Sequence, residues 1–365
     1  MSLISFARGI PAPECLPVDE LADCARAAIA RDGKTVLSYG PGGGYGPLRE
    51  WIAARHGVEP GRVVITSGSL KGFVFLAEQL VRQGTRVLVE APTYDRPIRV
   101  LRRLGAEIVG VAMDDDGLMP DALEDALAAG DKPAAFLYTI ATFQNPSGRT
   151  MALERRRRVA ELAHEHDLLV LEDDPYGLVR YEGTALPTIF ELEGGERVAY
   201  ASSFSKTVAP GVRVGYFVLP PDLAQQMEAL AVSTYITPPF MTQATVHEFL
   251  GRGDFEPNLE RVRGLLRGRR DAMLEALPEH MPGGATWSRP EGGYFIWLDL
   301  EDDAPTVAAA EAAGVTFVPG TDFFADGGGK RSLRLALSFV STDEIREGVA
   351  RLAGVLAGAP AATPL

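Results

Sequence analysis

Residues 153–173, LERRRRVAELAHEHDLLVLED, contain the two patterns that decide the fold. Up to His166, the charged and apolar residues are spaced as on an amphipathic helix. Leu168 to Leu171 then form a short apolar run, which is typical of a strand that is buried on both faces of a sheet. A helix that leads directly into a buried strand predicts one unit of an α/β fold.

The same alternation continues on both sides of this stretch, from Arg62 to about Leu219. Strands are predicted at residues 63–66, 86–89, 107–111, 135–138, 168–171, 198–200 and 212–217. Helices are predicted between several of them, at residues 70–82, 120–129 and 153–166. Because the strands are almost continuously apolar, we expect a mostly parallel sheet in an α/β/α sandwich, with helices on both faces.

A smaller α+β unit is predicted after Pro238 and Pro239, where long charged helices replace the alternation. Its predicted helices are at residues 255–277, 306–313 and 342–356, and its predicted strands are at residues 295–298, 315–318 and 333–337. The predicted domains are an N-terminal arm that packs with the small domain (residues 1–38), a large domain (residues 39–252) and a C-terminal small domain (residues 253–365).

Charge and composition argue against several classes of function. The net charge of -13 repels phosphate backbones and anionic lipid surfaces, so we expect no nucleic-acid partner. No signal peptide is recognisable at the start, and charges interrupt every apolar run before it is long enough to cross a membrane. We therefore expect a cytoplasmic protein without a membrane partner. The two cysteines and the scattered histidines predict neither a disulfide framework nor a metal site.

Candidate functional residues follow several of the predicted strands. In open α/β sheets, ligands bind outside the carboxyl ends of the strands. Polar and aromatic residues stand at these positions: Ser67 to Ser69, Pro92 to Tyr94, Asn145, Asp173 to Tyr176, and Ser203 to Lys206. We therefore expect one site at this edge of the sheet.

Lys206 is the candidate nucleophile of that site. It stands among serines and a threonine, and Pro210 and Gly211 end the segment in a turn. A lysine that forms a Schiff base must be shielded from bulk water and kept partly unprotonated. On its own, Lys206 is more simply a surface lysine in a serine-rich loop. The residues at the other strand ends favour a covalent link to pyridoxal 5'-phosphate (PLP) instead.

Those strand ends offer the groups that PLP requires. Asp173 can place a carboxylate beside the pyridine nitrogen and raise the pKa of that nitrogen. Tyr176 and Asn145 can reach the phenolic oxygen. The alternative for residues 172–174 is a solvated acidic turn or a cation site. A phosphate site is predicted from N–H groups at a helix start, hydroxyl groups and a cation: Ser69, Leu70, Ser203, Ser205 and Arg213.

The run SFSKTVAPGVRVG at residues 203–215 resembles the cofactor-lysine motif of fold-type I PLP enzymes, the class I and II aminotransferases. Within that family, the chain is most similar to the branch of the 2-aminoadipate and kynurenine aminotransferases and the effector domain of MocR-type regulators. The likeness extends from Ile4 to Leu335. It implies a fold-type I transferase fold with PLP as cofactor.

The resemblance implies a role for each candidate residue. It implies these cofactor contacts: Lys206 in the Schiff base, Asp173 at the ring nitrogen, Tyr176 and Asn145 at the phenolic oxygen, Tyr94 stacked on the ring, and Ser69, the backbone of Leu70, Ser203, Ser205 and Arg213 at the phosphate. It implies these substrate contacts: Arg334 at the α-carboxylate, Gly9 over the substrate, and Asn145. Tyr39 matches the tyrosine that such enzymes lend to the phosphate of the partner subunit, which implies a homodimer.

Arg8 is a further candidate, because it stands beside Gly9. It would recognise an acidic, polar or guanidino-bearing substrate side chain. The alternative is a simple surface role.

Together these residues predict ping-pong transamination from an L-amino acid to a 2-oxo acid such as 2-oxoglutarate. The same residues support other PLP reactions, namely racemisation, elimination, cyclisation or oxidation. A serine acyl-enzyme of the S-x-x-K type is disfavoured, because the S-D-N and K-T-G tripeptides that accompany this pattern do not occur in the sequence. A regulatory role like that of the MocR-type proteins is the remaining alternative.

Overall fold

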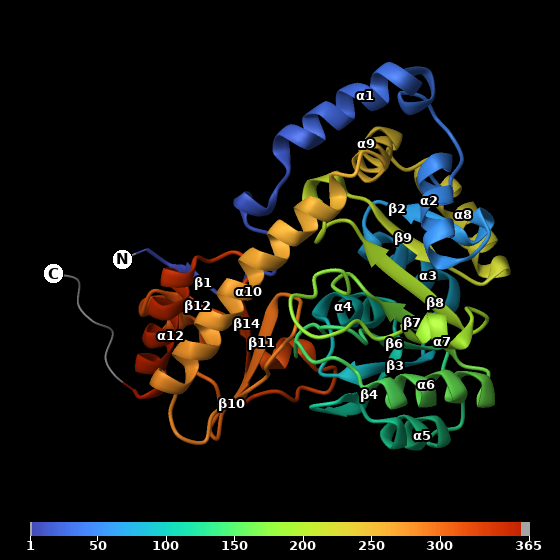
Figure 1. The fold of residues 1–365 in the computed structure, drawn as a ribbon. Helices are drawn as coiled ribbons and strands as arrows, with labels where there is room; N and C mark the ends of the chain where they lie inside the picture. Colours follow the sequence, from blue (N-terminus) through green and yellow to red (C-terminus); the bar gives the residue numbers. More distant parts are fainter. Residues whose placement is uncertain (1, 359–365) are drawn as a thin grey trace.

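The computed structural model describes residues 2–358, and its centre is an eight-stranded sheet (Figure 1). The strand order is β2 (Val63–Thr66), β9 (Gly215–Val218), β8 (Val198–Ser203), β7 (Leu169–Asp173), β6 (Phe136–Thr139), β3 (Arg86–Ala91), β4 (Glu107–Asp114) and β5 (Gly117–Leu118). The strands from β8 to β4 pair in parallel, whereas β9 and β5 run antiparallel to their neighbours. The predicted α/β fold with a mostly parallel sheet is confirmed.

Helices cover both faces of this sheet, because successive apolar side chains of each strand point to opposite faces. On β2, for example, Val63 and Ile65 face one core and Val64 faces the other. The first face packs against α2 (Gly46–His56), α5 (Pro120–Ala128), α6 (Leu153–Glu165), α7 (Ile189–Glu193) and α9 (Phe240–Gly251). The second packs against α3 (Ser69–Leu80), α4 (Asp95–Arg103) and α8 (Pro221–Tyr235).

A smaller sheet lies beside the large one and has its own core. Its strand order is β10 (Thr286–Trp287), β11 (Phe295–Asp299), β14 (Ser332–Ala336) and β13 (Val318–Pro319). Three helices accompany it: α10 (Phe255–His280), α11 (Val307–Ala312) and α12 (Thr342–Leu356). The long α10 leads from α9 to this sheet (Figure 1).

The N-terminal segment connects with both units. Its first strand, β1 (Ile4–Ser5), pairs in parallel with β12 (Val315–Thr316) next to the small sheet. The following helix α1 (Val18–Val36) packs along α9 instead (Figure 1). The domain boundaries after residues 38 and 252 stay a prediction, and residues 359–365 of the expected small domain lie outside the described residues. Within residues 2–358, no helix is both long and apolar enough to cross a membrane.

Two strand predictions were wrong in part. The strand expected at residues 212–217 begins only at Gly215, because Pro210–Val212 form a 3-10 turn and Arg213 adopts a left-handed conformation with φ of 50°. The strand expected at residues 315–318 is divided at Phe317: the first part pairs with β1, and the second pairs with β14.

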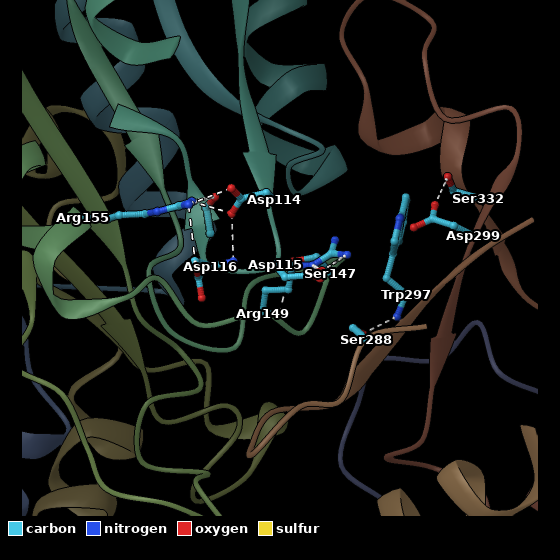
Figure 2. A network of polar contacts seen from close by, with 11 residues as sticks. Asp114, Asp115, Asp116, Ser147, Arg149, Arg155, Ser288, Trp297, Asp299 and Ser332 are labelled. Atoms are coloured by element: carbon cyan, nitrogen blue, oxygen red, sulfur yellow. Dashed lines mark hydrogen bonds and ion pairs between the residues drawn. The ribbon is translucent and has the colours of Figure 1, made fainter. Parts of the chain in front are cut away.

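Ion pairs with the β4–β5 hairpin hold the C-terminal part of the loop between β6 and α6 (Figure 2). Arg149 in this loop donates to Asp115 Oδ1 over 3.0 and 2.8 Å, and Arg155 of α6 donates to both carboxylate oxygens of Asp114 over 2.5 and 2.7 Å. Across from them, Ser288 of the small unit accepts a hydrogen bond from the Trp297 N–H over 2.9 Å. The middle of the same loop carries Asn145, so these pairs stabilise a segment that reaches the site described next.

Candidate functional site

A cavity of about 510 Å³ opens at the carboxyl ends of the parallel strands, between the two sheets. Its volume is in the usual range for a small-molecule site. Every residue predicted from the sequence lines it except Tyr39: Arg8, Gly9, Ser69, Leu70, Tyr94, Asn145, Asp173, Tyr176, Ser203, Ser205, Lys206, Arg213 and Arg334. The side chain of Tyr39 lies elsewhere and is 77% exposed.

Lys206 lies in the turn after β8, where its amine points into the cavity. Its Nζ donates a hydrogen bond to the backbone oxygen of Gly9 over 2.8 Å, and it lies 5.2 Å from the ring centre of Tyr294. Burial, followed by the positive charges of Arg334 and Arg213, lowers the pKa of Lys206 to about 8. Near neutral pH, a much larger fraction of this amine is therefore unprotonated than in an ordinary lysine, which favours a role as nucleophile.

Asp173 is the last residue of β7, and one of its carboxylate oxygens is left without a partner. Oδ2 accepts a hydrogen bond from the Tyr138 hydroxyl over 2.7 Å. Oδ1 is buried, and no group in residues 2–358 donates to it. Burial raises the pKa of Asp173 to about 7. A buried acceptor without a donor is unfavourable, so a ligand that brings an N–H group to Oδ1 would satisfy it.

The start of α3 lies at the cavity beside Arg213 and offers groups that could bind an anion. The first N–H groups of a helix have no partner within the helix, and those of Ser69 and Leu70 lie at the cavity. Arg213 donates to Ser67 O over 3.2 Å and to Ser205 Oγ over 3.4 Å, which holds its guanidinium next to the helix start.

Glycine is required at two positions around this helix start. A Cβ atom at Gly68, where φ is 86°, would lie 2.1 Å from Arg213 Nη2. One at Gly215 would lie 2.3 Å from the backbone N of Ser69. The backbone is therefore shaped to let these groups approach one another closely.

Arg334 of β14 supplies a second, buried cation. It donates to Asn145 Oδ1 and to Ala7 O, each over 3.0 Å, whereas its Nε is buried and has no acceptor among the described residues. The guanidinium carbon lies 4.3 Å from the ring centre of Phe295 and 5.0 Å from that of Phe323. Two rings and two acceptors thus fix the plane of a cation that still has an N–H group to donate.

The remaining predicted residues form the walls of the cavity. Tyr94 precedes α4, and burial raises its pKa and that of Tyr176, so both hydroxyls stay protonated. Gly9 cannot be replaced freely, because a Cβ atom there would lie 2.6 Å from the Phe295 ring. Arg8 is exposed at the cavity mouth, with its guanidinium carbon 5.1 Å from the ring centre of Phe339.

Several groups at the site were not foreseen, among them Tyr138, Tyr294 and Phe323. Tyr138 could have been found, because it belongs to a predicted strand next to β7 and alternation places it on the same sheet face as Asp173. Tyr294, whose hydroxyl donates to Lys206 O over 3.2 Å, and Phe323 come from the small unit. No local pattern indicates that they reach the cavity.

The chain matches the family model of aminotransferase class I and II over residues 13–352. It is 38% identical to 2-aminoadipate transaminase of Thermus thermophilus, with 98% of this chain and 90% of that relative covered. It is 35% identical to aromatic-amino-acid aminotransferase 1 of Thermococcus litoralis, with 96% of this chain and 87% of that relative covered.

Solved structures are similar to the whole described fold. Kynurenine aminotransferase of Pyrococcus horikoshii, solved in complex with PMP, superposes with a TM-score of 0.94 at 36% identity, covering 98% of this chain and 91% of that chain. A second structure is that of the α-aminoadipate aminotransferase of Thermus thermophilus, complexed with N-(5'-phosphopyridoxyl)-L-leucine. It superposes with a TM-score of 0.92 at 37% identity, and the match covers 98% of this chain and 92% of that chain.

Proposed function

Because the chain belongs to the class I and II aminotransferases, which are PLP-dependent enzymes, we propose that it transfers the amino group of an L-amino acid to 2-oxoglutarate. The observation that carries this choice of substrates is Arg334, a buried cation with a free N–H group in the same cavity as Lys206. An α-carboxylate is common to amino acids and 2-oxo acids, so one arginine serves both half-reactions. We further propose that the enzyme is cytoplasmic.

The lining of the cavity fits PLP. Asp173 Oδ1, a buried acceptor without a donor, suits the protonated ring nitrogen. The start of α3, together with Ser203, Ser205 and Arg213, suits the phosphate. Tyr176 and Asn145 would donate to the phenolic oxygen, Tyr94 would stack on the ring, and Lys206 would hold the cofactor covalently. When bound, PLP supplies an electron sink for the negative charge that develops on the substrate α-carbon.

Proton transfer is then the task of Lys206. With PLP bound, the freed Nζ of Lys206 would take up the α-proton of the substrate and later return it, acting as a general base and then as a general acid. The lowered pKa of about 8 suits both directions of this transfer near neutral pH. Asp173 would be ionised beside a protonated ring nitrogen, and Arg334 and Gly9 would hold the substrate in place.

Arg8 is the residue that we propose as the reader of the substrate side chain. It lines the same cavity as Arg334 but is exposed at the mouth, whereas Arg334 lies in the interior. A substrate held by its α-carboxylate on Arg334 would extend its side chain outward. An acidic or polar side chain would then meet the Arg8 guanidinium.

A homodimer is the assembly that we propose, with Tyr39 contributed to the phosphate site of the partner. The support is an exposed apolar surface around Tyr39, defined by Leu37, Tyr39, Val232, Ile236 and Met241. This surface has two parts, residues 37–39 and residues 232–241. They are adjacent in space, because a Cβ atom at Gly42, which is close in sequence to Tyr39, would lie 2.4 Å from Val232. Contiguous exposed apolar side chains of this kind are typical of protein interfaces.

The activity is tested with purified protein, PLP, a series of L-amino acids and 2-oxoglutarate. We expect a yellow protein that forms glutamate in a donor-dependent manner. The variant Lys206→Ala should lose both the visible absorbance of the bound cofactor and turnover, with activity reduced by several orders of magnitude. Consumption of amino acids without glutamate formation would overturn the choice of acceptor, and a colourless protein that gains no absorbance with PLP would overturn the site.

A further inference from the structure

The loops that carry Tyr94 and Asn145 leave two neighbouring strands of the large sheet. Tyr94 follows β3 and Asn145 follows β6, and these strands pair in parallel with Val89 opposite Tyr138. The proposed function places a cofactor ring between these two loops. The contacts that fix the distance between the two loops therefore also influence the orientation of the ring.

Glu90, the penultimate residue of β3, lies buried between the loops. It is 1% exposed and does not line the cavity. Its Oε1 accepts a hydrogen bond from the Thr139 hydroxyl over 2.6 Å, and its Oε2 accepts from the Ile140 N–H over 3.1 Å and from Gln144 Nε2 over 2.9 Å. Burial raises the pKa of Glu90, and the three donors oppose that rise. A carboxyl group in such a place is costly unless its hydrogen bonds are kept.

Gln144 connects the buried carboxylate of Glu90 to both loops. Its Nε2 also donates to Pro92 O, two residues before Tyr94, over 2.7 Å. Its Oε1 accepts from the Ser147 N–H over 2.8 Å, inside the loop that carries Asn145. Since Nε2 donates to the oxygens of Glu90 and Pro92 and the partner of Oε1 is an N–H group, the orientation of this amide is determined by its surroundings.

The Glu90–Gln144 pair is also linked to two further groups of the site, through the residues that follow Gln144 and Pro92. Asn145 directly follows Gln144 and accepts the hydrogen bond from Arg334. Thr93 directly follows Pro92, and its N–H group donates a hydrogen bond to the backbone oxygen of Phe323. The ring of Phe323 lies against Arg334. One buried pair is thus connected to the groups proposed for the ring, the phenolic oxygen and the α-carboxylate.

We propose that the Glu90–Gln144 pair is a positioning device that sets the separation of Tyr94 and Asn145 and thereby the orientation of the cofactor ring. The proposal rests on the proposed function for its role in cofactor binding. The mechanical part, the coupling of the two loops, rests on the hydrogen bonds alone. Neither residue is catalytic, since neither lines the cavity.

Hydrogen exchange in the protein without PLP tests the coupling. Glu90→Ala and Gln144→Leu should both speed amide exchange at residues 93–95 and 145–149, because each variant removes a tie between the loops. The matched control is Glu172→Ala, which removes a carboxylate that is also 1% exposed but accepts from the N–H groups of Ile189 and Phe190. Its effect should be confined to the start of α7. Unchanged exchange in both loops would overturn the proposal.

Binding of pyridoxamine 5'-phosphate, followed by protein fluorescence, tests the consequence for the cofactor. Glu90→Ala and Gln144→Leu should weaken this binding by about tenfold, because each variant removes buried hydrogen bonds that hold the two loops in place. Glu90→Gln should restore it, because the amide oxygen can accept from Ile140 and Gln144 while the amide nitrogen donates to the Thr139 hydroxyl. A similar loss of binding in Glu172→Ala would overturn the positioning role.

The two proposals fail separately in these experiments. Should Glu90→Ala not fold, Gln144→Leu still removes the bridge while Glu90 keeps two of its donors. If the wild type forms no glutamate but the exchange pattern is as expected, the proposed function fails and the coupling stands. If glutamate is formed and the exchange of both loops is unchanged, the coupling fails alone.

Discussion

Burial acts in opposite directions on the two ionisable groups at the centre of the cavity. It lowers the pKa of the Lys206 amine to about 8 and raises that of the Asp173 carboxyl to about 7, because in each case it disfavours the charged form. A positive ring nitrogen at Asp173 Oδ1 would stabilise the carboxylate and return its pKa toward ordinary values. Cofactor binding and the ionisation of Asp173 should therefore be linked.

The pKa of Lys206 predicts how fast PLP is taken up at different pH values. The amine reacts only when unprotonated, so the rate of uptake should rise with pH and level off above about 8, not near the ordinary value of 10.5. The measurement is the increase in visible absorbance after PLP is added to cofactor-free protein at pH values on both sides of 8. Lys206→Ala is the control and should show no uptake at any pH. An inflection near 10.5 would contradict the prediction.

We predict that replacement of Arg8 lowers activity selectively, with acidic donors affected most. In Arg8→Ala, kcat/KM for acidic donors should fall by about tenfold or more, because an exposed charge-assisted hydrogen bond is lost, whereas aliphatic donors should be little affected. The matched control is Arg96→Ala, a second arginine of the cavity lining, whose Nε lies 3.6 Å from Asp95. An equal loss for all donors would leave Arg8 with a surface role.

The residues of the site were predictable where they end a strand of the large sheet. Asp173 follows an apolar run, so its place at the carboxyl edge follows from the pattern. The hydrogen bond between Arg334 and Asn145 was not predictable, because it joins two units that lie far apart in the sequence. Glu90 gave no signal either, since a glutamate after an apolar run is usually exposed.

At the scale of elements, strands were easier to predict than helices. Buried strands such as β7 consist of apolar residues on both faces and stand out in the sequence. In contrast, α4 spans only nine residues, and its apolar face consists of Pro97, Ile98 and Leu101 among four arginines, so it is too short to stand out. The end of α8 carries exposed apolar residues such as Val232, so α8 shows no clean apolar face. The left-handed Arg213 could not be foreseen, because a non-glycine residue rarely adopts that conformation.

The N-terminus of α12 predicts a stability effect. Ser341 Oγ accepts from the Glu344 N–H over 3.2 Å, and the Glu344 side chain accepts from the Ser341 N–H over 2.8 Å. Ser341→Ala should lower the free energy of unfolding by about 1 kcal/mol, measured from the urea midpoint. Ser341→Asp, which keeps an acceptor, should lose little. The control Ser233→Ala, an exposed serine in α8, should leave the midpoint unchanged, and an equal shift in both alanine variants would contradict the capping role.

At the scale of the whole molecule, one exposed residue combines apolar character with backbone strain. Ile236, at the end of α8, is 53% exposed and has φ of 69°. For a β-branched residue this conformation costs on the order of 1–3 kcal/mol, and such strain is retained mainly where function requires it. The next residue, Thr237, donates to Pro41 O over 3.4 Å, so Ile236 is near the segment that carries Tyr39, which favours an interface with a second copy.

The dimer is tested by placing a charge on this surface. In sedimentation velocity, the wild type should behave as a dimer, and Ile236→Asp should shift it toward the monomer because a buried unpaired charge is unfavourable in an interface. Transaminase activity should fall with it, since Tyr39 would be lost from the partner's site. Val18→Asp, at an apolar residue that is 66% exposed at the start of α1, is the control and should remain dimeric. A monomeric wild type with full activity would contradict the proposal.

The parallel pairing of β1 with β12 has a consequence for biosynthesis. Ile4 is made first but pairs with Val315, so the apolar segment with Ile4 and Phe6 must wait for its partner while the rest of the chain is translated. At about 5–20 residues per second, that delay is roughly 15–60 s. Throughout this time the apolar segment with Ile4 and Phe6 lacks its partner strand, and exposed apolar surface of this kind favours aggregation. Arg334 is made later still, so the site is completed only after the partner of Ile4 has been made.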